Sequence, residues 1–370
     1  MGTLRGKAML ARKGEELLNK LISQDPTFGG RLALITAPQG AGKTTLLLKL
    51  AEALMGNEYV IWRGRDLAQF HRLPDWRKKV KIFAHKHDEL TFYKLEHGSE
   101  YAEEIQIKVH KYETPEDILK QLEKDKLNVI FEPSFYSISE ELALEVLRRS
   151  GLRINKKQLS EMKSAYFWFE FLYRLLLRPD RRWISILIDE IDDTFPETPT
   201  GLQWKLQAWV KDIAKDLRKA FITLIGTTHT NTHVDWKIRS KMQARIYLSG
   251  AQLEEDSLIN DKEFPLRLAI GTALIEWYGL GFGLFKFSKL PEKNYDLLVQ
   301  KKWLGPIPTL TEDKRREGSI AEMVRRVAMK EGIETALKLI DDLKAQGEIT
   351  PRWAWELKRR IKSEVPSKTP

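Results

Sequence analysis

Residues 31–54 place a short apolar run, a glycine-containing loop and a helical pattern directly after one another. The apolar run covers residues 32–35 and predicts a buried strand. The loop follows as residues 37–44 (APQGAGKT), and a helix with leucines on one side begins at Thr44. A strand that enters a helix through such a loop is the arrangement that cradles a phosphate group. The stretch predicts an α/β fold built on a parallel sheet, and its context disfavours a chance glycine turn.

The residue types in this loop suit the phosphates of a nucleotide. Gly40 and Gly42 allow the backbone amides to turn inward, Lys43 supplies a positive charge to the β- and γ-phosphates, and the Thr44 hydroxyl can ligate Mg²⁺. Ala37 stands where the usual pattern has its first glycine. The residues predicted to bind ATP are Ala37, Pro38, Gln39, Gly40, Ala41, Gly42, Lys43, Thr44 and Thr45.

A second motif is a continuous apolar strand, residues 184–188 (ISILI), that ends in Asp189 and Glu190. This is the Walker B arrangement, in which Asp189 would hold Mg²⁺ through water and Glu190 would polarise the attacking water. A carboxylate beside the metal aspartate distinguishes water-activating ATPases from kinases, which need no such base. The two motifs together predict a Mg²⁺-dependent enzyme that hydrolyses ATP to ADP and phosphate.

A third strand, residues 221–225 (FITLI), ends in the sequence Gly226-Thr227-Thr228-His229. A polar residue at this strand end would lie beside the γ-phosphate and sense it. Thr228 and His229 are both candidates, and spacing does not choose between them. Ordinary strand-end polarity is the alternative.

Four arginines have two interpretations each. Arg239 or Arg245 could reach the γ-phosphate of a neighbouring subunit as an arginine finger, or could form a salt bridge or contact the DNA backbone. Arg63 and Arg65 follow a predicted strand at residues 58–62. They could meet phosphate or DNA, or lie in an ordinary solvated basic loop.

The composition narrows the class of partner. The net charge is +10 and the isoelectric point is about 9.4, which favours a polyanion, nucleic acid first and an acidic membrane surface second. The absence of cysteine excludes disulfides and thiolate zinc sites and fits a cytoplasmic protein. The most apolar stretches carry charged residues and are too short for a membrane span, so any membrane role is expected to depend on a partner.

The pattern of elements predicts four parts. They are an N-terminal helical segment (1–30), a P-loop ATPase core (31–304) with an inserted α/β region at about 63–180, a linker (305–318), and a small, basic, helical C-terminal module (319–370). The C-terminal module could be a helix-turn-helix for DNA or a docking or oligomer-capping module.

Periodicity gives further local expectations. Residues 90–97 and 104–110 predict a hairpin, and residues 202–219 predict an amphipathic helix with Trp204 on its apolar face. Residues 156–177 predict one long helix, whose aromatic cluster at 166–173 is more typical of a core or interface than of base stacking. Residues 266–280 predict a further helix, followed by a strand at 281–290.

The loop at 37–44, the Asp189-Glu190 pair and the Thr227–His229 strand end occur in the order of the additional-strand class of P-loop ATPases. The segment from Asp235 to Lys241 and the strand ARIYL follow. This order resembles the HerA/FtsK superfamily of DNA-pumping ATPases, and is nearest to archaeal plasmid- and virus-encoded members and to secretion coupling and packaging ATPases. Many such proteins carry Gln at the sensor position, where this chain has Thr or His.

The resemblance implies a RecA-like core, a hexameric ring with DNA in its central channel, and an arginine finger supplied in trans. It leads to the hypothesis of an ATP-driven motor on double-stranded DNA, with nuclease or membrane proteins as conceivable partners. The alternative is an AAA+ or STAND-type switch, or a replication initiator, that binds DNA through the C-terminal module.

Overall fold

The computed structural model describes residues 2–306, 320–325, 327–329, 332–345, 349 and 351–364. The chain divides into two compact units, Met1–Gly305 and Pro306–Pro370, and each is described by itself. Along the residues described, no helix is both long enough and apolar enough to cross a membrane.

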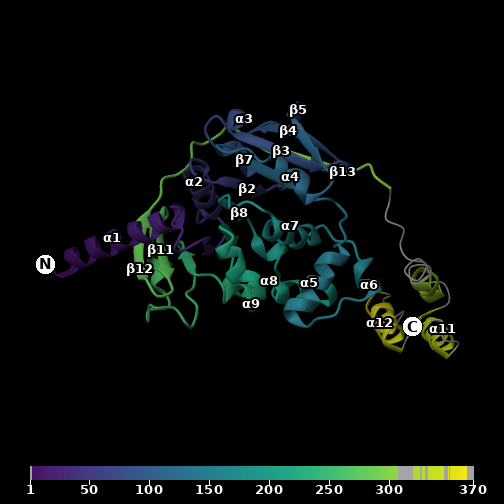
Figure 1. Ribbon diagram of the computed structural model, residues 1–370. Helices are drawn as coiled ribbons and strands as arrows, with labels where there is room; N and C mark the ends of the chain where they lie inside the picture. The colour runs from purple at the N-terminus through teal and green to yellow at the C-terminus, as the bar shows by residue number, and fades with distance from the viewer. Residues whose placement is uncertain are drawn as a thin grey trace. The chain divides into compact units, whose positions relative to one another are not determined.

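The first unit is built on a ten-stranded sheet (Figure 1). Every strand from β10 to β6 pairs in parallel, while β11 and β12 are antiparallel at one edge. Strands buried on both faces read as continuous apolar runs, which explains why β1, β7 and β8 were visible in the sequence. In sheet order the strands are β12 (Gly281–Lys286), β11 (Thr272–Trp277), β10 (Ala244–Tyr247), β1 (Leu32–Thr36), β9 (Ile222–Thr228), β8 (Ile184–Ile188), β2 (Tyr59–Arg63), β7 (Leu127–Phe131), β3 (Val80–His85) and β6 (Val109–Tyr112).

Helices cover both faces of this sheet, which confirms the predicted P-loop NTPase fold class (Figure 1). On one face lie α4 (Pro115–Gln121), α5 (Glu140–Ser150), α7 (Tyr166–Leu177) and α8 (Gly201–Lys219). On the other lie α1 (Gly2–Ile22), which packs on β12, and α2 (Lys43–Met55). The aromatic side chains of α7 are buried in the core, as expected.

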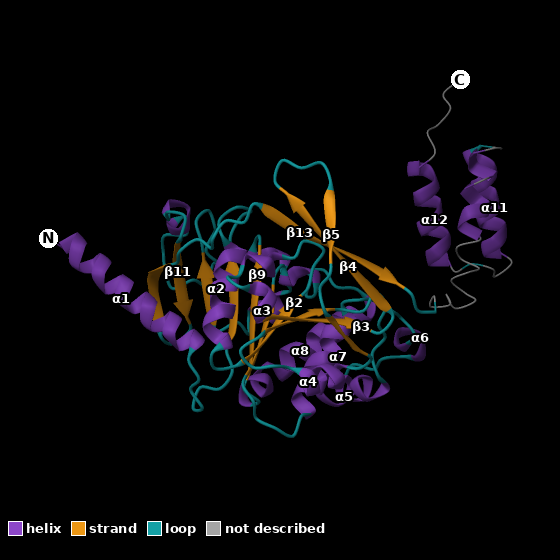
Figure 2. Ribbon diagram, turned by 90° about the horizontal axis from the view of Figure 1, so that it is seen from above, coloured by secondary structure: helices purple, strands orange, loops and turns teal. Residues whose placement is uncertain are grey.

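A separate three-stranded sheet has the order β13-β4-β5 (Figure 2). Its strands are β13 (Tyr295–Trp303), β4 (Asp88–Glu96) and β5 (Ala102–Ile105). The predicted hairpin exists as β4 and β5, but its second strand lies at Ala102–Ile105 and not at 104–110, because Val109–Tyr112 forms β6 and joins the main sheet. Strand β13 was not predicted, and it pairs with β4 from about 200 residues away in the sequence, which no local pattern reveals.

Two predicted helices are wrong. Residues 266–280 contain strand β11, whose sequence TALIEW is buried between β10 and β12. Hydrogen-bonded pairing with these two strands overrides the helical periodicity of the sequence. Residues 156–177 form α6 (Lys156–Leu159) and α7 instead of one helix. The intervening backbone is drawn away from helical bonding, since Lys163 N donates to Tyr136 O at 3.0 Å.

The α/β region predicted at about 63–180 contributes to both sheets. Its strands β3, β6 and β7 extend the main sheet beyond β2, and only β4 and β5 leave it for the second sheet. Short helical turns complete the first unit: η1 (Gln69–Arg72), α3 (Trp76–Lys79), η2 (Ile191–Asp193), η3 (Asn231–His233), α9 (Trp236–Arg239) and η4 (Phe264–Arg267).

The second unit is helical. It contains helical residues at 320–325 and 327–329, then α11 (Ile333–Ala345) and α12 (Pro351–Glu364). These segments share an apolar core that includes Val324, Ile340 and Leu357. The linker predicted at 305–318 lies outside the described residues from position 307 onward.

Candidate active site

The predicted motifs meet at one edge of the sheet. Strand β9 lies between β1 and β8, with Thr36 opposite Thr228 and Ile188 opposite Gly226. The loop after β1, the acids after β8 and the polar end of β9 therefore come together at the carboxyl ends of three adjacent strands, where ligands bind in open α/β sheets.

The phosphate-binding loop turns into α2 through left-handed glycines. Gly40 has φ 81° and Gly42 has φ 96°, values that other residues adopt only with strain. Lys43 is 7% exposed and donates from Nζ to Ala37 O at 2.7 Å and to Pro38 O at 3.0 Å. Burial lowers the pKa of Lys43, against the opposing pull of Asp189, Glu190 and Asp192. Its ammonium also lies 3.1 Å from His229 Nδ1.

Asp189 is held on both carboxylate oxygens. Thr44 Oγ1 donates to Oδ2 at 2.8 Å, and Thr227 Oγ1 donates to Oδ1 at 2.5 Å. A hydroxyl and a carboxylate in contact, at the start of a helix, are the oxygen ligands that Mg²⁺ prefers. The residues present therefore fit a magnesium ion, with Thr44 and Asp189 as its holders.

Glu190 sits in a left-handed conformation, φ 54° and ψ 66°. Its amide donates to Thr227 Oγ1 at 3.0 Å. The turn closes over Gly226, where an added Cβ would lie 2.4 Å from the Ile191 side chain, so only glycine permits this packing. Glu190 is thus a non-glycine residue in the left-handed region, where its backbone is strained. Strained residues of this kind occur frequently at functional sites.

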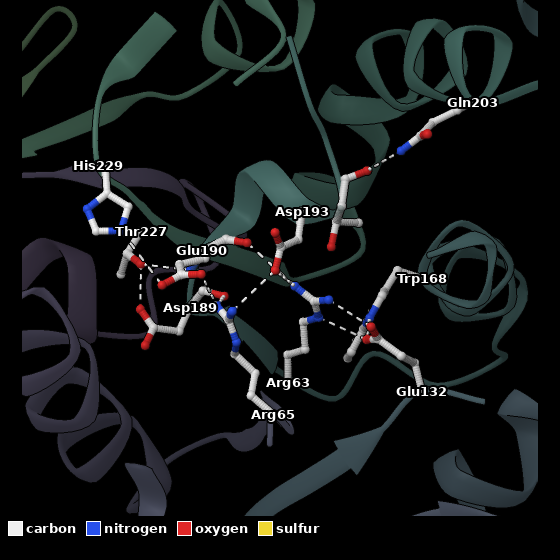
Figure 3. Close-up of polar contacts among 11 residues, drawn as sticks. Arg63, Arg65, Glu132, Trp168, Asp189, Glu190, Asp193, Gln203, Thr227 and His229 are labelled. Carbon is white, nitrogen blue, oxygen red and sulfur yellow. Dashed lines mark hydrogen bonds and ion pairs between the residues drawn. The ribbon is translucent and has the colours of Figure 1, made fainter. Parts of the chain in front are cut away.

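The Glu190 carboxylate lies between a guanidinium and an imidazole (Figure 3). Oε2 is 2.5 Å from Arg65 Nη1, and Oε1 is 3.7 Å from His229 Nε2. Arg65 also lies 3.5 Å from Asp193. The proposed water-activating group is therefore already paired with a cation from the end of β2.

Arg63 forms the base of this network (Figure 3). It donates to buried Glu132 at 2.9 and 2.7 Å and to Asp193 at 3.2 Å, while Trp168 Nε1 also donates to Glu132. Burial alone would lower the pKa of Arg63, but Glu132 and Asp193 outweigh it and raise that pKa. The contact of Arg63 or Arg65 with phosphate or DNA stays a prediction, and within the chain Arg63 is buried while Arg65 is about one-third exposed. Both bind carboxylates at the Walker B end.

The two sensor candidates point differently. His229 faces Lys43 and Glu190, whereas the buried Thr228 hydroxyl donates to Thr230 O at 2.9 Å. Thr227, which sequence reasoning passed over, makes the contact with Asp189. Strand alternation was the available signal, because residues 227 and 229 share one side of a strand and residue 228 takes the other.

The predicted arginine fingers bind acids that follow β10. Arg239 contacts Glu254 at 3.4 Å, and Arg245, 5% exposed, bonds Asp256 at 2.5 and 3.0 Å. Within this chain the structure does not bring either to Glu190. Arg239 and Glu254 line a cavity of about 1050 Å³ that reaches the loop at Pro38 and Gln39.

No protein-family model and no curated protein sequence matches the chain. Among solved structures, the chain is similar to the genome packaging NTPase B204 of Sulfolobus turreted icosahedral virus 2 (11% identity, TM-score 0.38, 72% of this chain and 98% of that one). It is also similar to the pCW3 conjugation coupling protein TcpA (12%, 0.37, 74% and 69%). A third is Thermomonospora curvata EccC (12%, 0.35, 72% and 38%).

These neighbours are P-loop ATPases of the HerA/FtsK type that the sequence resembles. At such identities and TM-scores the similarity concerns the fold alone.

Proposed function

We propose that the chain is a Mg²⁺-dependent ATPase that hydrolyses ATP to ADP and phosphate. The observation that carries this proposal is the position of Glu190 next to the Asp189–Thr44 pair, at the strand ends that also present Lys43. A carboxylate at this position has a role in water activation, which a non-catalytic nucleotide-binding scaffold does not need.

Each side chain has a role in this proposal. Lys43 would exchange its contacts with loop carbonyls for the β- and γ-phosphate oxygens of ATP, where its charge stabilises the transition state. Glu190 would orient the attacking water and accept its proton, and His229 would contact both the phosphate and Glu190. Bound Mg²⁺, held by Thr44 and Asp189, would supply charge neutralisation on the phosphates.

The Glu190→Gln variant tests this proposal. It removes proton acceptance while keeping the size of the side chain, so we expect the hydrolysis rate to fall by about 10²–10⁴-fold with ATP binding retained. Glu197→Gln is the matched control, because Glu197 is exposed and its hydrogen bond within the described residues runs from its backbone amide to His233 O. Wild-type hydrolysis by Glu190→Gln would remove Glu190 from the mechanism.

We also propose that hydrolysis drives movement of double-stranded DNA through a ring of subunits, a hexamer by resemblance. The order of the three motifs supports this proposal, and so does the net charge of +10, which favours a polyanionic partner. Arg239 or Arg245 would act in trans only if an adjacent subunit drew it from Glu254 or Asp256. The parts of the chain would then be a motor core at 31–304 and a helical module at 319–370.

The second candidate function is a switch or replication initiator that binds DNA through its C-terminal unit. One feature favours it: α12 exposes Trp355, with the Arg359 guanidinium 5.6 Å from its ring. Deleting residues 311–370 separates the two functions. Loss of DNA binding with ATPase activity intact would favour the initiator, and retained DNA binding would favour the motor.

A further inference from the structure

The first unit exposes two large aromatic side chains at one place. Trp204 in the first turn of α8 is 40% exposed, and Trp236 at the start of α9 is 57% exposed. The sequence predicted Trp204 on the buried face of its helix, and the structure places it on the outer face. Exposed tryptophan is unfavourable in water and, when clustered, marks an interaction site.

Lysines surround the two indole rings. Lys237 Nζ lies 5.5 Å from the Trp204 ring and 5.8 Å from the Trp236 ring, and Lys211 Nζ lies 5.3 Å from the Trp236 ring. These cation–π contacts hold the ammonium groups over flat aromatic surfaces. We call Trp204, Lys211, Trp236 and Lys237 the Trp-Lys surface.

Nearby acids offset only part of the positive charge of this surface. Asp212 and Asp216 of α8 bond to Ser150 and Arg149 at the α5 side. Asp235 is fully buried, where it caps α9 and forms an ion pair with Lys237 Nζ at 3.3 Å, so Lys237 orders the two indole rings and Lys211 carries the charge offered to a ligand. Exposed Lys215 and Lys241 lie on the same two segments and add positive charge. The surface is therefore basic and aromatic, a combination that suits nucleic acid, whose phosphates meet ammonium groups and whose sugars and bases pack on aromatic rings.

Two loops connect this surface with the active site. The chain leaves Glu190 through residues 191–200 and enters α8, and it leaves His229 through residues 230–235 and enters α9. The loops bond to each other, with Asp235 N donating to Phe195 O at 3.1 Å and Glu197 N donating to His233 O at 2.9 Å. Gln203 of α8 donates to Thr194 O at 3.2 Å, so α8 holds the loop that follows Glu190 (Figure 3).

We propose that the Trp-Lys surface is a nucleic-acid contact site whose occupancy is transmitted to Glu190 and His229 by these two loops. Lysine ammonium groups meet backbone phosphates, and the indole rings pack on the sugars of the duplex backbone. The proposal rests on the proposed action on DNA and names the residues that make the contact.

The experiment compares wild type with Trp204→Ala/Trp236→Ala in duplex-DNA binding by fluorescence anisotropy with a non-hydrolysable ATP analogue. ATPase rates are then measured with and without DNA. We expect the double variant to bind DNA at least about tenfold more weakly and to lose DNA stimulation, with basal ATPase activity unchanged. Tyr101→Ala, which removes an exposed aromatic side chain just before β5, is the matched control and should bind as wild type does.

Lys211→Ala gives a second readout that does not depend on the indoles. Because Lys211 touches only the Trp236 ring among the contacts observed, its loss should leave the fold intact. The plot of the logarithm of the DNA-binding constant against the logarithm of the salt concentration has a negative slope. This slope should become shallower by about 0.9 if one phosphate contact is lost. An unchanged slope would remove Lys211 from the contact, and wild-type DNA binding by the double variant would by itself overturn the Trp-Lys surface.

The outcomes separate this inference from the proposed function. If wild type binds DNA and the double variant binds equally well, the surface is wrong and the DNA-dependent ATPase stands. If wild type neither binds DNA nor changes its ATPase rate when DNA is added, the proposed function on DNA is contradicted. If the double variant changes the mass of the assembly while each subunit keeps its DNA affinity, the surface is a contact between copies of this chain, which also overturns the inference.

Discussion

Two pairs of arginines flank the phosphate-binding loop, and the structure uses them differently. Arg63 and Arg65 reach from the end of β2 to the acids after β8, and one of those acids is Glu190. Arg239 and Arg245 turn to Glu254 and Asp256, on the far side of β1. In the sequence all four were basic residues near strand ends. The acids that each arginine binds decide whether its substitution should change the ATPase rate or the stability of the fold.

Arg63 should matter most for stability. Its partner Glu132 is 7% exposed, and Arg63→Ala would leave that carboxylate buried without its ion pair. We expect a loss of about 3–5 kcal/mol in the free energy of unfolding, measured by urea denaturation. The double variant Arg63→Met/Glu132→Gln should lose much less, because Gln can still accept from Trp168. Wild-type stability of Arg63→Ala would show that the pair is not structural.

Arg65 should affect rate more than stability, because the pair that it forms with Glu190 is about one-third exposed on both sides. A carboxylate that already accepts from a guanidinium is a poorer acceptor for a water proton. Arg65→Ala should therefore raise the basal ATPase rate by up to about tenfold, which is less than the full rate contribution of a general base. A fall in kcat at saturating ATP would instead make Arg65 a residue that positions Glu190.

The smallest effect is expected at Asp256. The hydrogen bond from Arg245 is the largest of the causes that lower its pKa from 3.8 to about 2. A carboxylate whose pKa is lower in the folded than in the unfolded protein stabilises the fold at pH values above its unfolded pKa. This contribution is lost as the pH falls through the folded pKa. Asp256→Asn should thus cost about 1 kcal/mol at pH 7, after allowance for the exposure of Asp256. Urea titrations between pH 5 and pH 2.5 should show this difference shrinking, and a constant difference would contradict it.

The main sheet could be predicted from the sequence because its strands are continuous apolar runs punctuated by motifs. The additional strand between β1 and β8 followed from the order of the loop, the acids and the polar strand end. Strands β11 and β13 could not be predicted in the same way, since both depend on partners distant in sequence.

The residues of the candidate site were mostly visible from the sequence, and their partners were not. Lys43, Thr44, Asp189 and Glu190 follow from spacing alone. The contact of Thr227 with Asp189 depends on which side of β9 each hydroxyl takes, and the Arg65–Glu190 pair depends on β2 lying beside β8. Neither the exposure of Trp204 nor its position beside Trp236 can be read from helical periodicity.

The mass of the assembly with ATP and duplex DNA tests the central claim most directly. The Glu190→Gln variant is suited to it, because bound ATP should persist without hydrolysis. A DNA motor predicts a DNA-bound complex several times the 43.1 kDa mass of one chain, which reverts when ATP is removed. A stable monomer under these conditions would contradict the motor.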